Sequence, residues 1–139
     1  MNAWRSYRLW MIVPAIFSLI LSFLIVACGD KDSRAVDAAE WLKSYYQIDP
    51  PNLEWVLINV TVDGIGQVVV DVLVPDEGQV DLIKSRPRTE QAFIVRMACP
   101  PKSAKVWTII SADQILWVNL LEKSSGGLFK KITGSSCKR

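Results

Sequence analysis

Two runs of alternating apolar residues constrain the fold more than any other feature of this sequence. Apolar side chains occupy every second position from 56 to 62 and again from 68 to 74, which is the period of strands with one buried face. Gly64-Ile65-Gly66 separates the runs, so together they predict a β-hairpin. A three-residue loop over 64–66 would place Gly66 in the left-handed conformation that glycine adopts without strain.

This loop also predicts how the two strands pair. The expected partners are Val62 with Val68, Val60 with Val70, Asn59 with Asp71, Ile58 with Val72 and Val56 with Val74. A slip by one residue would set Ile58 against Asp71, and the buried face of the hairpin opposes that exchange.

Helical spacing marks two further segments. Apolar residues recur at intervals of three and four within 35–47, which predicts an amphipathic helix with Ser33 as its N-cap. A second stripe, which includes Phe93 and Met97, favours a helix over 89–98, although part of it also suits a buried strand.

The last third of the chain predicts a second hairpin. Strand patterns occupy 115–122 and 128–133, with a turn over 124–127 between them. Residues 79–84 and 103–111 fit either a strand or a helix. Because helices and strands are segregated along the chain, the predicted class is α+β. We expect a small, mainly antiparallel sheet of about four strands with helices on one face.

The N-terminal segment differs from the rest of the chain in its charge. No charged residue occurs from Leu9 to Ala27, and Arg5 and Arg8 stand just before this run. A basic segment followed by an apolar run is typical of an export signal. The run also approaches the ~20 residues of a membrane-spanning helix, so a cleaved signal and a retained anchor are both open.

Ile25-Val26-Ala27-Cys28 ends this run and resembles the lipobox of bacterial lipoproteins. In that class the cysteine thiol receives a diacylglycerol, the signal is cut before the cysteine, and the new amino group is usually acylated. The resemblance implies a signal peptide over 1–27, a lipid on Cys28, a polar tether over 28–34 and an exported domain over 35–139. It places the chain in a bacterial cell envelope, anchored to a membrane and facing the periplasm.

Two positions refine the match. Ile25 stands where leucine is the usual residue of a lipobox. Gly29, rather than an aspartate, directly follows Cys28, and by resemblance this favours the outer membrane over the inner one.

The cysteine count supports the same interpretation. The chain has three cysteines, and if Cys28 carries lipid, Cys99 and Cys137 remain as a pair. In an oxidising compartment we expect them to form a disulfide. It would close a loop of about 38 residues and stabilise the fold by about 3–4 kcal/mol in the chain-entropy model. No C-x-x-C motif or histidine accompanies them, which argues against a redox or zinc site.

Composition excludes several function classes. The chain contains no histidine, so serine–histidine and cysteine–histidine nucleophile pairs are impossible. Arg5 and Arg8 account for the whole excess of 16 basic over 14 acidic residues, so the remainder lacks the basic footprint of a nucleic-acid binder. Acidic residues at 76, 77 and 81 could supply an acid pair, but such clusters are usually solvated loops. We predict no enzyme activity, no cofactor and no metal site.

Trp55, Trp107 and Trp117 are the remaining candidates for a partner or ligand surface, because tryptophan is enriched in interaction hot spots. Packing in the core is the alternative for each of them. We predict a lipid-anchored, non-catalytic module that binds a protein of the envelope or of a membrane complex. Two other functions stay open: a pocket for a small periplasmic ligand, and a subunit retained by an uncleaved N-terminal helix.

Overall fold

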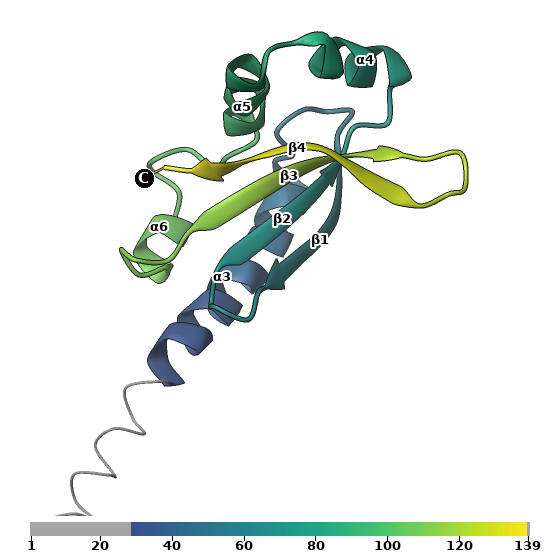
Figure 1. Ribbon diagram of the computed structural model, residues 1–139. Coiled ribbons are helices and arrows are strands. Elements are labelled where there is room, and N and C mark those ends of the chain that lie inside the picture. Colours follow the sequence, from purple (N-terminus) through teal and green to yellow (C-terminus); the bar gives the residue numbers. More distant parts are fainter. Residues whose placement is uncertain (1–28, 139) are drawn as a thin grey trace, which may run out of the picture. The chain divides into compact units, whose positions relative to one another are not determined.

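The computed structural model describes residues 29–138 and confirms the α+β class. The elements are α3 (Gly29–Ile48), β1 (Val56–Val62), β2 (Val68–Leu73), α4 (Glu77–Ser85), α5 (Arg88–Met97), α6 (Val106–Ile109), β3 (Leu116–Lys123) and β4 (Phe129–Cys137). Residues Arg34–Arg139 form a compact unit of their own (Figure 1). No helix within the described range is both long and apolar enough to cross a membrane. The predicted signal over 1–27 and the predicted lipid site at Cys28 lie outside the described residues.

The first hairpin pairs as predicted near its turn and differently at its far end. Val62 lies opposite Val68, Val60 opposite Val70 and Asn59 opposite Asp71. A β-bulge then adds Ile58 to β1, so that Leu57 faces Val72 and Val56 faces Leu73. The predicted pairs of Ile58 with Val72 and of Val56 with Val74 are therefore wrong, because a bulge shifts the register of every later residue by one.

Both hairpins close with the same turn. The Asp63 N–H donates to the Gln67 carbonyl at 2.9 Å, and the Gly66 N–H donates to the Asp63 carbonyl at 3.1 Å. In the second hairpin, the Ser124 N–H donates to Leu128 and the Gly127 N–H to Ser124, both at 2.8 Å. Gly66 and Gly127 each have a φ of 77°, which confirms the left-handed position predicted for Gly66.

The two hairpins join through a parallel pair in the middle of the sheet. The strand order is β1-β2-β3-β4, with β2 and β3 parallel and the outer pairs antiparallel. Helices α4, α5 and α6 carry the chain from the end of β2 to the start of β3, as a parallel connection requires. The sheet is thus mainly antiparallel, as expected, with one parallel pair that the local pattern could not reveal.

One core cluster joins the sheet to all the described helices. Its sheet residues alternate along the two central strands and are almost fully buried: Val68, Val70, Val72, Leu116, Val118 and Leu120. Leu42 of α3, Val80 of α4, Val95 of α5 and Val106 of α6 belong to the same cluster. Figure 1 shows α3 passing behind the sheet. The side chains between the core positions, such as those of Asp71 and Asn119, are only half-buried, and we call their side of the sheet the open face.

The predicted disulfide is present. Cys99 and Cys137 are bonded, with their Cα atoms 5.6 Å apart and 38 positions between them in sequence. Cys99 follows the end of α5 and Cys137 ends β4, so the bond links the crossover helices to the last strand.

Several element boundaries differ from expectation. Helix α3 begins at Gly29, so residues 29–34 of the expected tether are helical and Ser33 lies inside the helix instead of capping it. This segment contains no proline, so nothing in its sequence interrupts a helix. The ambiguous residues 79–84 lie in α4, and 103–111 contain the short α6. Strand β4 continues to Cys137, four residues beyond its expected end at Thr133.

Candidate interaction surface

Two of the three tryptophans considered as candidates for an interaction surface lie in the core. Trp55 is 8% exposed and its Nε1–H donates to Gln79 Oε1 on α4 at 2.9 Å. Trp107 is 6% exposed and its Nε1–H donates to the Pro101 carbonyl at 2.8 Å. Their burial removes both from any contact surface, so for Trp55 and Trp107 the core-packing alternative holds.

Trp117, the third of these residues, is half-buried and lies in a hydrogen-bonded network on the open face. Its Nε1–H donates to Asn119 Oδ1, and Asn119 Nδ2 donates to Asp71 Oδ1, both at 2.8 Å. The Lys131 ammonium lies 5.5 Å from the centre of the Trp117 ring, within the range of a cation–π interaction. A side chain at Gly134 would approach Asn119 Oδ1 to 2.6 Å, so the network requires glycine there. The polar groups of this network bond to one another, which favours a structural role for Trp117.

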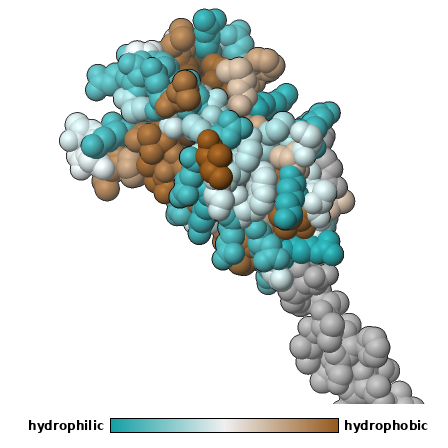
Figure 2. All heavy atoms as spheres, turned by 180° about the vertical axis from the view of Figure 1, so that it is seen from behind, coloured by the Kyte–Doolittle hydropathy of each residue, from teal (hydrophilic) through white to brown (hydrophobic). Residues whose placement is uncertain are grey.

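The largest exposed apolar side chains on the helical connection lie on α4 and α5. Leu82 is 54% exposed, Phe93 64% and Met97 60%. Together with Ile94 they line a shallow groove of about 450 Å³. We call these four residues the α4–α5 patch. Figure 2 shows brown residues among teal ones at the upper end of the molecule, where Figure 1 places α4 and α5.

Local sequence explains why these two helices meet at a corner. Asp76 caps α4, since its Oδ1 accepts from the Gln79 N–H at 2.7 Å. Pro87 stands between the helices, where it ends α4 and begins α5. The Gln91 side chain donates to the Arg86 carbonyl at 2.9 Å across the corner. These bonds set the angle at which α4 and α5 present their side chains.

The rim of the patch carries charged side chains. Arg86 and Glu90 line the groove and form an ion pair at 3.4 Å. Arg96 is exposed and stands three residues after Phe93, which makes the two helical neighbours. An apolar centre with a charged rim is the common arrangement of a protein-binding surface.

The C-terminal end of α5 is held from two sides. The Cys99–Cys137 disulfide links it to β4. The buried Tyr46 hydroxyl of α3 donates to the Ala98 carbonyl at 2.5 Å. Burial raises the pKa of Tyr46 well above its ordinary value of 10.0, so the phenol stays protonated and remains a donor. The patch is therefore displayed on a fixed support rather than on a loose helix.

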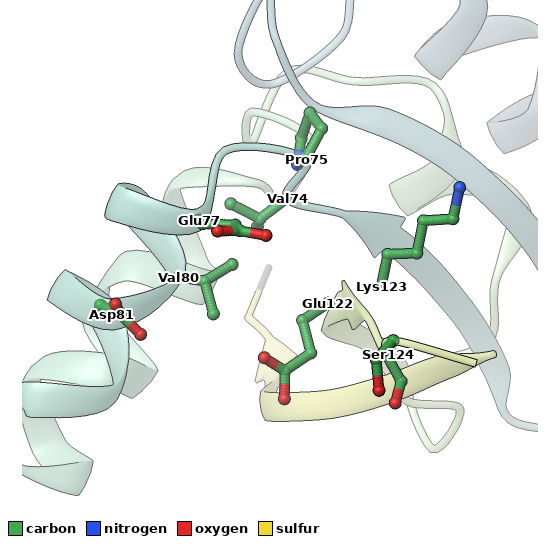
Figure 3. Close-up of a pocket in the computed structure, with 9 residues that line it drawn as sticks. Val74, Pro75, Glu77, Val80, Asp81, Glu122, Lys123 and Ser124 are labelled. Atoms are coloured by element: carbon green, nitrogen blue, oxygen red, sulfur yellow. The ribbon is translucent and has the colours of Figure 1, made fainter. Parts of the chain in front are cut away.

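A second hollow lies where the parallel strands β2 and β3 end. It measures about 430 Å³, and Figure 3 shows Glu77 and Asp81 of α4 on one side and Glu122, Lys123 and Ser124 on the other. Glu122 forms an ion pair with Lys84. The predicted carboxylates are thus divided: Asp76 caps a helix, while Glu77 and Asp81 line a solvated hollow. Neither this hollow nor the α4–α5 groove is lined by tryptophan.

The α4–α5 patch was not identified as a site from the sequence. Phe93 and Met97 fit a helical stripe, and such a stripe ordinarily indicates a buried face. In the structure, Val95 is the buried residue of α5 instead, and Ala98, which caps the helix, is buried as well. An excess of apolar residues over what one helix face can bury is the signal that could have revealed the patch.

Comparison with protein-family models, with curated proteins and with solved structures finds no match for this chain.

Proposed function

We propose that this chain is a bacterial envelope lipoprotein, anchored through Cys28, whose domain is a non-catalytic module that binds another protein. The α4–α5 patch is the proposed binding surface. The partner is a protein of the envelope or of a membrane complex, because the anchor keeps the domain close to a membrane.

The single observation that carries this proposal is the exposure of Leu82, Phe93 and Met97 on adjoining helices. Each of these side chains has more than half of its surface in water, although burial of such a side chain contributes about 1.5–3 kcal/mol. Phenylalanine and methionine are also enriched in protein interfaces relative to other surface residues. A partner that covers the groove would bury them without any change in the fold.

The export part of the proposal rests on the N-terminal sequence and is supported by the disulfide. Disulfides persist in oxidising compartments such as the bacterial periplasm and are rare in the cytosol. The Cys99–Cys137 bond is therefore compatible with an exported domain.

Intact mass of the protein extracted from membranes tests the anchor. We expect a mass equal to residues 28–139 plus acyl chains, with a gain of two hydrogens on reduction. A mass that includes residues 1–27 without acyl chains would show that the N-terminal segment is retained as the anchor. Cys28 would then be a free thiol.

Site-specific photo-crosslinking tests the binding surface. A photoreactive phenylalanine analogue replaces Phe93 in the full chain in native membranes, and the matched control carries it at Lys43, an exposed position on α3. We expect a protein adduct from position 93 that is absent from position 43 and reduced by Met97→Ser. Adducts to lipid alone, or equal protein adducts from both positions, would contradict a protein-binding patch.

A further inference from the structure

The outer edge of β1 carries only one of the features that usually protect an edge strand, the bulge at Ile58, and Val60–Val62 lie beyond it. β1 is the first strand in the sheet order, so one of its sides has no strand beside it among residues 29–138. Its sequence from Val56 to Val62 contains no charged residue and no proline. Edge strands of monomeric proteins are commonly protected by lysine, by proline or by a covering element, because their free N–H and C=O groups invite pairing.

The opposite edge of the same sheet is protected. β4 carries Lys130 and Lys131, and α5 packs against this strand. The β4 edge thus has lysines and a covering helix, whereas residues Val60–Val62 of the β1 edge have neither within the described part of the chain.

The turn of the first hairpin determines which backbone groups face outward from β1. The Asp63 N–H bonds to Gln67 across the hairpin. Bonded and non-bonded pairs alternate along an antiparallel ladder, so Val62 and Val60 occupy the non-bonded positions. Their N–H and C=O groups therefore point away from β2, toward the free edge.

We propose that β1 pairs with β1 of a second copy of this chain, antiparallel, about a twofold axis at Thr61. In this register Val60 lies opposite the partner subunit's Val62, and the outward N–H and C=O groups of each strand bond to those of the other. The four-stranded sheets of the two copies then form one continuous sheet across an isologous interface.

The side chains of β1 match across this axis. Val60 and Val62 are on the core side, so apolar residues meet apolar residues there. Thr61 is exposed on the open face and meets its own equivalent, and threonine pairs across antiparallel strands are favourable. Asn59 lies opposite the partner subunit's Asp63, so no two like charges face each other.

The bulge favours this register over its neighbour. A pairing centred on Val60 would place the bulged Ile58 in the ladder, whereas a pairing centred on Thr61 uses Val60–Val62, beyond the bulge. This inference does not depend on the α4–α5 patch, which lies on other elements.

Charge at the twofold axis tests the proposal. The full chain in mild detergent is examined by sedimentation velocity as wild type, as Thr61→Lys, as Thr61→Glu and as an equal mixture of the two variants. We expect a wild-type dimer, a weakening of about tenfold or more in each variant alone, and a dimer again in the mixture, because opposite charges then meet. A monomeric wild type would overturn the proposal, and the β1 edge would then be free to pair with an extended segment of another protein. A mixture that dimerises no more tightly than either variant alone would also overturn it.

Cysteine crosslinking gives a second, independent test. Thr61→Cys in native membranes is expected to form an interchain disulfide, since directly opposed cysteines in a non-bonded antiparallel pair lie within reach. Leu53→Cys, which is 95% exposed but off the strand, is the control and is expected to stay monomeric. Equal crosslinking of both variants, or of neither, would overturn the proposed pairing.

Discussion

Helices α3 and α5 both carry an apolar stripe at helical spacing, but they use it differently. The stripe of α3 is buried along its length: Ala35, Ala38, Leu42 and Tyr46 all belong to the core. The stripe of α5 that includes Phe93 and Met97 has both of these side chains more than half exposed, and the fully buried Val95 lies on the opposite side of the helix. Sequence periodicity therefore predicts which residues share a helix face, but the tertiary fold determines whether that face is buried.

The two helices are also held by different means. α3 is held by its own apolar residues, which reach the centre of the core. α5 packs Val95 into the core and lies against β4, and its ends are also fixed by the corner with α4 and by the disulfide and the Tyr46 hydrogen bond beyond its last turn. This arrangement leaves the exposed half of α5 available for contact.

Truncation of the α3 stripe is expected to have the largest effect on stability. Leu42 is fully buried, so Leu42→Ala leaves a cavity and should lower the free energy of unfolding by about 3–5 kcal/mol. Denaturant unfolding of the full chain measures this loss. A loss below about 1 kcal/mol would show that α3 is not part of the core.

Removal of the disulfide should have the next largest effect. The double variant Cys99→Ala/Cys137→Ala frees the end of α5, and it should lower the free energy of unfolding by about 3–4 kcal/mol for a loop of this length. The same variant should lose the photo-crosslink from position 93 even under conditions where it stays folded. A crosslink of unchanged yield would mean that the patch does not depend on this link.

Loss of the Tyr46 hydroxyl should have a smaller, pH-dependent effect. Tyr46→Phe leaves the Ala98 carbonyl without its donor and should cost about 1–3 kcal/mol at neutral pH. Because burial raises the pKa of Tyr46 above 10.0, ionisation favours the unfolded chain once the pH exceeds about 10. The stabilisation that the protonated Tyr46 contributes is therefore complete below pH 10, and it is lost as the pH rises toward the pKa of Tyr46 in the folded protein.

Unfolding curves between pH 8 and about pH 11 measure this dependence. Wild type should lose stability at the alkaline end relative to Tyr46→Phe, in which the group cannot titrate. Parallel losses in both proteins would show that Tyr46 is not the group responsible.

Substitution on the exposed half of α5 should have the smallest effect on stability. Phe93→Ser and Met97→Ser remove side chains that are mostly in water, so the free energy of unfolding should change by no more than about 0.5 kcal/mol. Val95→Ala on the same helix is the matched control and should be clearly destabilising, since Val95 is fully buried. Similar losses from Phe93→Ser and Val95→Ala would contradict the assignment of one exposed and one buried side to α5.

Local features of the fold could be predicted from the sequence. The turn at Gly66 follows from glycine chemistry, and the pairs next to it follow from the turn. The Cys99–Cys137 bond follows from counting cysteines in a chain expected to be exported. These features depend on residues close together in sequence or on a choice among very few partners.

Features that depend on distant contacts could not be predicted. The bulge at Ile58 lies at the end of β1 where Trp55 bonds to Gln79, a residue of α4 that is 24 positions away. The parallel pairing of β2 with β3 depends on how α4, α5 and α6 carry the chain from the end of β2 to the start of β3. Whether Trp55 and Trp107 lie in the core or at a surface could not be decided from the sequence, because tryptophan suits both places and only packing distinguishes them.

The central claim is that the exposed half of α5 binds a protein while the buried half holds the fold. Native electrophoresis of mild detergent extracts tests it, with wild type, Phe93→Ser/Met97→Ser and the surface control Lys43→Ser compared in the same membranes. We predict that wild type and the control migrate in a complex heavier than a dimer of this chain, and that the double variant leaves this complex while its disulfide and unfolding free energy are unchanged. A double variant that stays in the heavy complex would contradict the claim.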